Sequence, residues 1–232
     1  MKWQGRGLPI AAGGAFVFGN GLNGSTFADC IDPLFASLAL PDPRESRPTL
    51  EVGVTSAAHG EGVSTIAYHL AVRAARSLPG EVVLVHASPR PVPYAVSLRM
   101  ARQPGFRELF SASARLDDCV ERTGPDALSI LPYGGTTSLL RPWGPDTMAA
   151  AFTELRARYA VTVLDLPPVS RSGDCLSLAA SASGVVLAIE ARRVGQRRLR
   201  RTCQMLRQAG ANVLGAVFNK QRGGGMRRYA AD

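Results

Sequence analysis

The stretch AAHGEGVSTIA has the residue types and spacing of a phosphate-binding loop. Gly60 and Gly62 stand between an apolar run and a helical pattern, where backbone N–H groups can wrap around phosphate oxygens at a helix N-terminus. A hydroxyl from Ser64 or Thr65 would suit magnesium. The lysine that such loops direct at the outer phosphates is absent, because Val63 stands in its place. The alternative is a tight strand-to-helix turn without chemistry.

A second candidate group ends the apolar run VTVLDLPP. Asp165 lies about 100 residues after the glycine loop, where a Walker B aspartate would hold magnesium through water. An aspartate at a strand end can also simply bond the next turn. Together with the loop, the carboxylate predicts a magnesium–nucleotide site in which Ser64 and Asp165 face the metal.

Alternating patterns would position these groups. Continuous apolar runs predict buried strands at 50–56, 81–87, 127–133, 160–169, 184–191 and 213–219. Helical patterns occupy 64–77, 104–110, 144–160 and 194–210. In the first helix Ile66, Leu70 and Ala74 share one face, and Gly210 suits the end of the last.

This alternation predicts an α/β fold, a mostly parallel sheet sandwiched by helices, as in P-loop NTPases. Ligands bind at the carboxyl ends of the strands in such sheets. That edge would gather the loop after Ser56, the segment after Val85, Asp165 and Asn219.

Composition sets the class of the chain. Its 232 residues are 46% hydrophobic and 19% charged, which suits a globular chain of one domain or two small ones. We expect a flexible tail at 1–24, a P-loop NTPase-like domain at 25–222 and a second tail at 223–232. No apolar run is long enough to span a bilayer.

The cysteines indicate the redox state of the chain, and the net charge indicates the kind of partner to expect. Cys30, Cys119, Cys175 and Cys203 lack metal-ligand spacing, so we expect reduced, buried thiols. The net charge is +9, and nearly all basic residues are arginines. That balance suits an anionic partner or reflects an arginine-rich genome.

Three stretches resemble one protein family. They are TSAAHGEGVST, VTVLDLPPVSRSGDC and, the most specific, LRRTCQMLRQAGANVLGAVFNK. The chain from about Asp29 to about Lys220 resembles the bacterial tyrosine kinases of capsule and exopolysaccharide synthesis, in the MinD/ParA-like P-loop class. The resemblance implies a cytoplasmic protein, peripheral to the inner membrane, that works with a chain-length-determinant membrane protein. It also leaves a homo-oligomer open.

The resemblance further implies ATP or ADP with magnesium as cofactor, unless the loop holds none. The nucleotide-binding residues would be the loop residues and an asparagine on the adenine side: Gly60, Glu61, Gly62, Val63, Ser64, Thr65 and Asn219.

The departures from the family pattern concern charge. The motif that resembles LLIDADLRRP becomes VLVHASPRPVP, with His86 and Ser88 in place of two aspartates and only Arg90 kept. The oligomerisation pattern E-x-x-R-x-x-R lacks its arginines near 32–38. Of the C-terminal tyrosine cluster only Tyr229 remains, as the candidate phosphoacceptor.

Three hypotheses follow. The first is a degenerate member, a pseudokinase that acts by docking on a membrane partner. The second is an active, atypical ATPase or kinase in which His86 is the base and Arg90, His59 or Lys220 supplies the cation. Against the second stands the simpler interpretation of His86 as a half-buried histidine at a strand end.

The third hypothesis is a binding module that uses a basic helix. The stretch RRVGQRRLRR would meet anionic lipid, an acidic segment or, least expected, nucleic acid. The candidate patch consists of Arg193, Arg197, Arg198, Arg200 and Arg201. The alternative is an ordinary solvated helix face.

Overall fold

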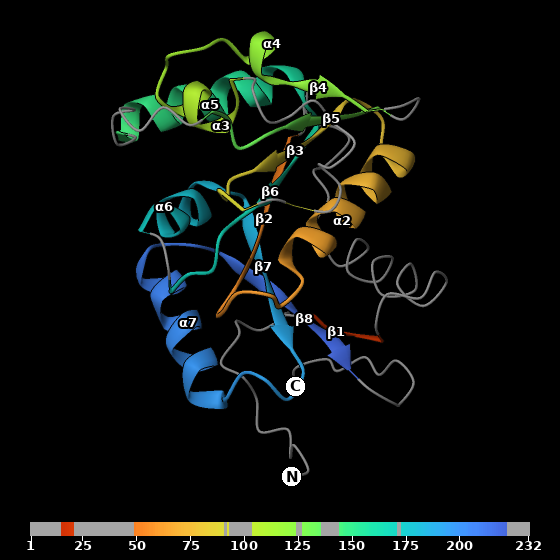
Figure 1. Ribbon diagram of the computed structural model, residues 1–232, viewed down its shortest axis with the longest axis vertical. Coiled ribbons are helices and arrows are strands. Elements are labelled where there is room, and N and C mark those ends of the chain that lie inside the picture. Colours follow the sequence, from red (N-terminus) through yellow and green to blue (C-terminus); the bar gives the residue numbers. More distant parts are fainter. Residues whose placement is uncertain are drawn as a thin grey trace.

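The apolar runs form one eight-stranded sheet in the computed structural model of the chain (Figure 1). The structure describes residues 15–20, 49–90, 92, 104–123, 127–135, 144–170 and 173–221. The strand order is β1-β8-β7-β2-β6-β3-β5-β4, and every neighbouring pair is parallel except β4 and β5. The predicted α/β fold with a mostly parallel sheet is confirmed.

The strands are β1 (Ala15–Asn20), β2 (Leu50–Ser56), β3 (Val82–His86), β4 (Glu121–Arg122), β5 (Leu128–Leu131), β6 (Val161–Asp165), β7 (Gly184–Glu190) and β8 (Val213–Gln221). The helices are α2 (Val63–Ser77), α3 (Phe106–Phe110), α4 (Leu116–Cys119), α5 (Pro145–Arg158), α6 (Gly173–Ser181) and α7 (Gln196–Gln208). Among these described helices, none has the length and apolarity to cross a bilayer.

Two hydrophobic layers lie on opposite faces of the sheet, because successive strand residues point in opposite directions. In β3, Val82 and Leu84 pack in the layer that α2 covers, while Val83 and Val85 pack in the layer with α5, α6 and α7. Figure 1 shows α2 on one side of the sheet and α6 and α7 on the other. The predicted buried face of α2, which includes Ile66, is confirmed.

The predicted segments match the structure except at their ends. Pro132 follows β5, and β6 stops at Asp165 just before Pro167 and Pro168. The last helix ends as expected: Gly210 has a φ of 85°, and its N–H donates to the Arg207 carbonyl over 2.9 Å.

Four elements were not predicted: α4, α6, β4 and β1. The first three are short or lack a strong pattern. The strand β1 lies inside residues 1–24, the segment expected to be a tail, and pairs in parallel with β8. The segments 32–38 and 223–232 lie outside the described residues.

Candidate nucleotide-binding site

The loop between β2 and α2 has the shape of a phosphate cradle. Gly60 and Gly62 adopt left-handed backbone angles, with φ of 81° and 92°. Only glycine takes these angles without cost, so they need this residue type. Gly62 caps α2, and its carbonyl accepts the N–H of Ile66 at 3.0 Å. The loop thus places a helix N-terminus at the carboxyl edge of the sheet, as a phosphate site requires.

Glu61 anchors the loop from within the protein. Its side chain is fully buried, and its carboxylate accepts the backbone N–H of Ala58 at 2.7 Å and that of Glu190 at 3.1 Å. Burial raises the pKa of Glu61, an effect that these hydrogen bonds partly offset and that the nearby Glu190 carboxylate reinforces. The sequence placed Glu61 among the nucleotide contacts, and the structure shows it supporting the loop.

The end of β8 holds the outer side of the loop. Asn219 is buried, and its Nδ2 donates to the Glu61 carbonyl at 3.0 Å while its Oδ1 accepts the Lys220 N–H at 2.8 Å. Lys220 has a left-handed φ of 57°, which is strained for a residue with a side chain. The amide of Asn219, expected on the adenine side, is therefore engaged by the loop itself.

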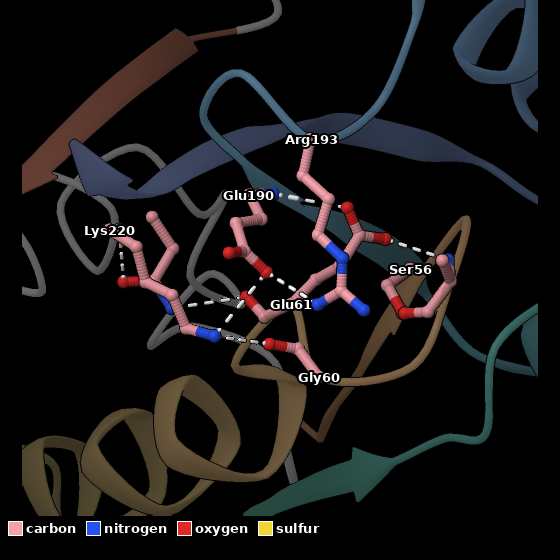
Figure 2. Close-up of polar contacts among 8 residues, drawn as sticks. Ser56, Gly60, Glu61, Glu190, Arg193 and Lys220 are labelled. Atoms are coloured by element: carbon pink, nitrogen blue, oxygen red, sulfur yellow. Dashed lines mark hydrogen bonds and ion pairs between the residues drawn. The ribbon is translucent and has the colours of Figure 1, made fainter.

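A small charged cluster lies over this junction. The Lys220 ammonium donates to the Gly60 carbonyl at 2.6 Å and lies 3.3 Å from Glu190 Oε2. The same oxygen accepts Arg193 Nη1 at 2.8 Å, and these two cations lower the pKa of Glu190. Figure 2 shows Lys220, Glu190 and Arg193 gathered above Gly60 and Glu61. Sequence reasoning named Lys220 and Arg193 for other roles and missed their common partner.

Ser64, His86 and Asp165 meet on the inner side of the loop. Ser64 Oγ donates to Asp165 Oδ1 at 3.1 Å, so the predicted approach of the hydroxyl and the Walker B carboxylate is confirmed. His86 Nδ1 lies 2.9 Å from Asp165 Oδ2, and its Nε2 lies 2.8 Å from the Arg90 carbonyl. His86 is 5% exposed, so it is more deeply buried than the half-buried histidine that the sequence suggested.

The donors and acceptors around His86 fix where protons lie. A carbonyl oxygen only accepts, so Nε2 must donate to Arg90. The contact between Nδ1 and Asp165 Oδ2 then needs one proton between the two atoms. Whichever atom holds that proton, the His86–Asp165 pair carries no net charge.

This arrangement does not fit a magnesium ion. Magnesium in P-loop proteins relies on the charge of the Walker B carboxylate. Here the imidazole of His86 either balances that charge or places a proton on the carboxylate, and both Asp165 oxygens are engaged in hydrogen bonds. The backbone cradle, in contrast, remains suited to a phosphate.

Most of the predicted residues line one cleft of about 330 Å³, although Glu61, His86 and Asn219 do not. It is lined by the loop, the ends of β3 and β6 and the end of β8, including His59, Gly60, Gly62, Val63, Ser64, Thr65, Ser88, Arg90, Asp165 and Lys220. Glu61 and Asn219 lie behind this surface. The expectation that the chemistry gathers on one rim of the sheet is confirmed.

The basic patch divides into two parts. Arg197, Arg198, Arg200 and Arg201 are exposed on α7, whose other face packs Leu199 and Leu206 into the core. Within the described residues, no carboxylate forms an ion pair with any of the four side chains. Arg193 is separate, paired with Glu190 next to Gly60.

The three described cysteines are free and buried, as expected: Cys119, Cys175 and Cys203. Burial raises the pKa of Cys175 to about 11, so its thiol stays protonated at neutral pH. Cys30 and Tyr229 lie outside the described residues.

Comparison with known proteins supports the resemblance seen in the sequence. The chain is 25% identical over 176 residues to the tyrosine-protein kinase YwqD of Bacillus subtilis, a match that covers 74% of this chain and 72% of that protein. It is 30% identical over 123 residues to EpsB of Ralstonia solanacearum, where the match covers 51% of this chain but only 16% of that protein. No protein-family profile matches the chain.

Solved structures agree. The kinase domain of VpsO superposes with a TM-score of 0.63 at 25% identity, over 75% of this chain and 86% of that chain. The chimerical protein CapA2B2 gives a TM-score of 0.70 at 19% identity, over 93% and 96% of the two chains, which shows the shared fold. These relatives and structures support the resemblance of this chain to the P-loop domain of the bacterial exopolysaccharide tyrosine kinases.

Proposed function

We propose that this chain is a degenerate, kinase-like regulator of exopolysaccharide biosynthesis or export. It binds a nucleotide in the loop cleft and transfers no phosphate. One observation carries the proposal: the loop keeps the backbone shape of a phosphate cradle, while Val63, His86 and Ser88 stand at positions where the family that the chain resembles has charged side chains.

The missing charges should slow phosphoryl transfer more than they weaken nucleotide binding. Losing one charge-assisted contact weakens binding by about 1.5–3 kcal/mol. Phosphoryl transfer suffers further, because negative charge on the transferred group must be stabilised in the transition state. Lys220, the nearest substitute, is held by the Gly60 carbonyl and Glu190.

The active alternative also needs a base. His86 is poorly suited to that role, because Nε2 donates to Arg90 and Nδ1 shares a proton with Asp165. Neither ring nitrogen has a lone pair directed at the cleft for a substrate proton. These contacts favour the non-transferring function over an atypical ATPase or kinase.

Incubation of the full chain with ATP and magnesium tests this proposal. We expect no phosphotyrosine, at Tyr229 or elsewhere, and no ADP release above the buffer rate, measured with radiolabelled ATP. A variant with Val63→Lys, His86→Asp and Ser88→Asp restores the family's charges and serves as the comparison. Labelling of wild-type Tyr229 would show that the chain is an active kinase and overturn the proposal.

The proposed partner is a chain-length-determinant-type protein of the inner membrane, which would hold this chain at the cytoplasmic face. The family resemblance supports that partner. The exposed arginines of α7 supply a surface for its acidic segment or for anionic lipid headgroups. Nucleic acid is the less favoured partner, and a homo-oligomer is compatible with either.

Changing two arginines on one face of α7 should weaken attachment to an anionic surface. Each arginine near such a surface contributes about 1 kcal/mol, so Arg197→Ala with Arg201→Ala should reduce binding about thirtyfold. Co-sedimentation with phosphatidylserine vesicles measures this. Arg76→Ala with Arg115→Ala removes the same charge from other exposed positions and should have a much smaller effect. Equal losses in both pairs would exclude α7 as the contact.

A further inference from the structure

The carboxyl end of β3 places an imidazole against the Walker B carboxylate. The register of the sheet pairs His86 on β3 directly with Asp165 on β6, which makes the two residues neighbours across the strands. The imidazole is held on its other side by the Arg90 carbonyl at 2.8 Å. A buried ring with a hydrogen-bond partner at each nitrogen has a fixed position.

This fixed ring occupies the surroundings of Asp165 that a hydrated metal ion would need. Oδ2 faces His86 and Oδ1 faces Ser64. Ser88 is 8% exposed and adds a hydroxyl rather than a carboxylate. A metal ion would have to displace the imidazole and take a proton from the pair, and it would gain only one carboxylate in return.

We propose that the cleft takes a nucleoside diphosphate without a metal ion, with the His86–Asp165 pair in the place where relatives carry magnesium. This inference rests on the nucleotide-binding part of the proposed function. It separates this chain from a structural neighbour such as the MinD protein of Pyrococcus horikoshii, which was solved with Mg-ADP and has a TM-score of 0.58 at 16% identity.

The preference for a diphosphate follows from the available charges. The loop N–H groups and the N-terminus of α2 can cradle the α- and β-phosphates without a cation. A third phosphate adds negative charge beside Val63 and the neutral His86–Asp165 pair. Among the described residues, the Lys and Arg side chains that line the cleft are those of Lys220 and Arg90; both are exposed, and Lys220 is already bonded to the Gly60 carbonyl and to Glu190. ADP should therefore bind at least as tightly as ATP.

Titration of the full chain with a fluorescent ADP analogue, in excess EDTA and in excess magnesium, tests the proposal. The wild-type dissociation constants should agree within about twofold, and unlabelled ATP should compete no better than ADP. His86→Asp places two carboxylates side by side, so magnesium should tighten its ADP binding about tenfold or more. Thr153→Asp adds a carboxylate on exposed α5, away from the cleft, and should leave the metal response at the wild-type level.

His86→Asn provides a second variant if the aspartate prevents folding. It removes the shared proton and frees the Asp165 charge, so it should also gain a magnesium response. Electron paramagnetic resonance of added manganese measures metal binding directly. Tight manganese binding by the wild-type chain, or a tenfold effect of magnesium on its ADP affinity, would overturn the inference. Failure to bind ADP in either buffer would also overturn the inference. Whether the chain transfers phosphate is tested separately, by the labelling experiment.

Discussion

Replacing Glu61 with glutamine should destabilise the folded chain by about 2–3 kcal/mol, because one of two partly buried backbone N–H groups loses its acceptor and faces a second donor instead. The carboxylate of Glu61 accepts from Ala58 and Glu190 with separate oxygens. Glutamine has one acceptor oxygen, and its amide nitrogen would face an N–H donor. Urea denaturation of both proteins measures the difference as a shift in midpoint at constant slope.

Glu154→Gln is the matched control. Glu154 is exposed on α5 and accepts one long bond, from the Leu116 N–H at 3.3 Å. The same chemical change there should cost less than about 0.5 kcal/mol. Similar losses of stability in both variants would show that the buried carboxylate of Glu61 contributes no more than an exposed one.

The same residue predicts a pH dependence. Because burial raises the pKa of Glu61 above its ordinary 4.5, the folded chain holds the proton more tightly than the unfolded chain. The stability contributed by this group is therefore complete below pH 4.5 and is lost as the pH rises through the folded value. The difference between wild type and Glu61→Gln should shrink across that window, and a difference that grew would contradict the direction of the shift.

Gly62→Ala should cost about 2–5 kcal/mol, from two separate causes. The φ of 92° disfavours any side chain, and an added Cβ would overlap Asn219 Nδ2. Asn219→Ala alone should cost about 1–2 kcal/mol, because it breaks the bonds to Glu61 and Lys220. In the double variant the overlap is gone, so the total should fall short of the sum by about 1 kcal/mol or more.

Gly60→Ala separates backbone strain from overlap. Its φ of 81° is similar, but the nearest atom to an added Cβ is the flexible end of Arg193, at 3.1 Å. We expect about 1–2 kcal/mol, from strain alone. Urea denaturation measures the stability of all these variants. If the losses from Gly62→Ala and Asn219→Ala simply add in the double variant, the side chain of Asn219 must move aside freely in Gly62→Ala.

Much of the architecture was predictable, because buried parallel strands leave a strong local signal. Runs such as VVLVH and VTVLD are apolar on both faces, and a parallel sheet brings their ends together. The meeting of Ser64 and Asp165 followed from that rule. The strand β1 did not, because an edge strand depends on a neighbour, here β8, that its own sequence does not reveal.

The contacts that decide the chemistry were not predictable in the same way. That His86 meets Asp165 depends on the register of β3 against β6. A single residue of slippage would turn the imidazole to the other face. The role of Glu61 depends on a backbone N–H at Glu190, which a sequence pattern does not encode. Local patterns therefore located the cleft but not its internal hydrogen bonds.

The tie between Asn219 and Glu61 has a consequence for how the chain is made. The two residues are 158 positions apart, and the Lys220 contact to Gly60 spans 160. During synthesis from the N-terminus, the glycine loop leaves the ribosome long before β8 exists. The loop can acquire its final shape only when the last strand arrives, so any ligand that recognises that shape binds only chains whose synthesis has passed Lys220.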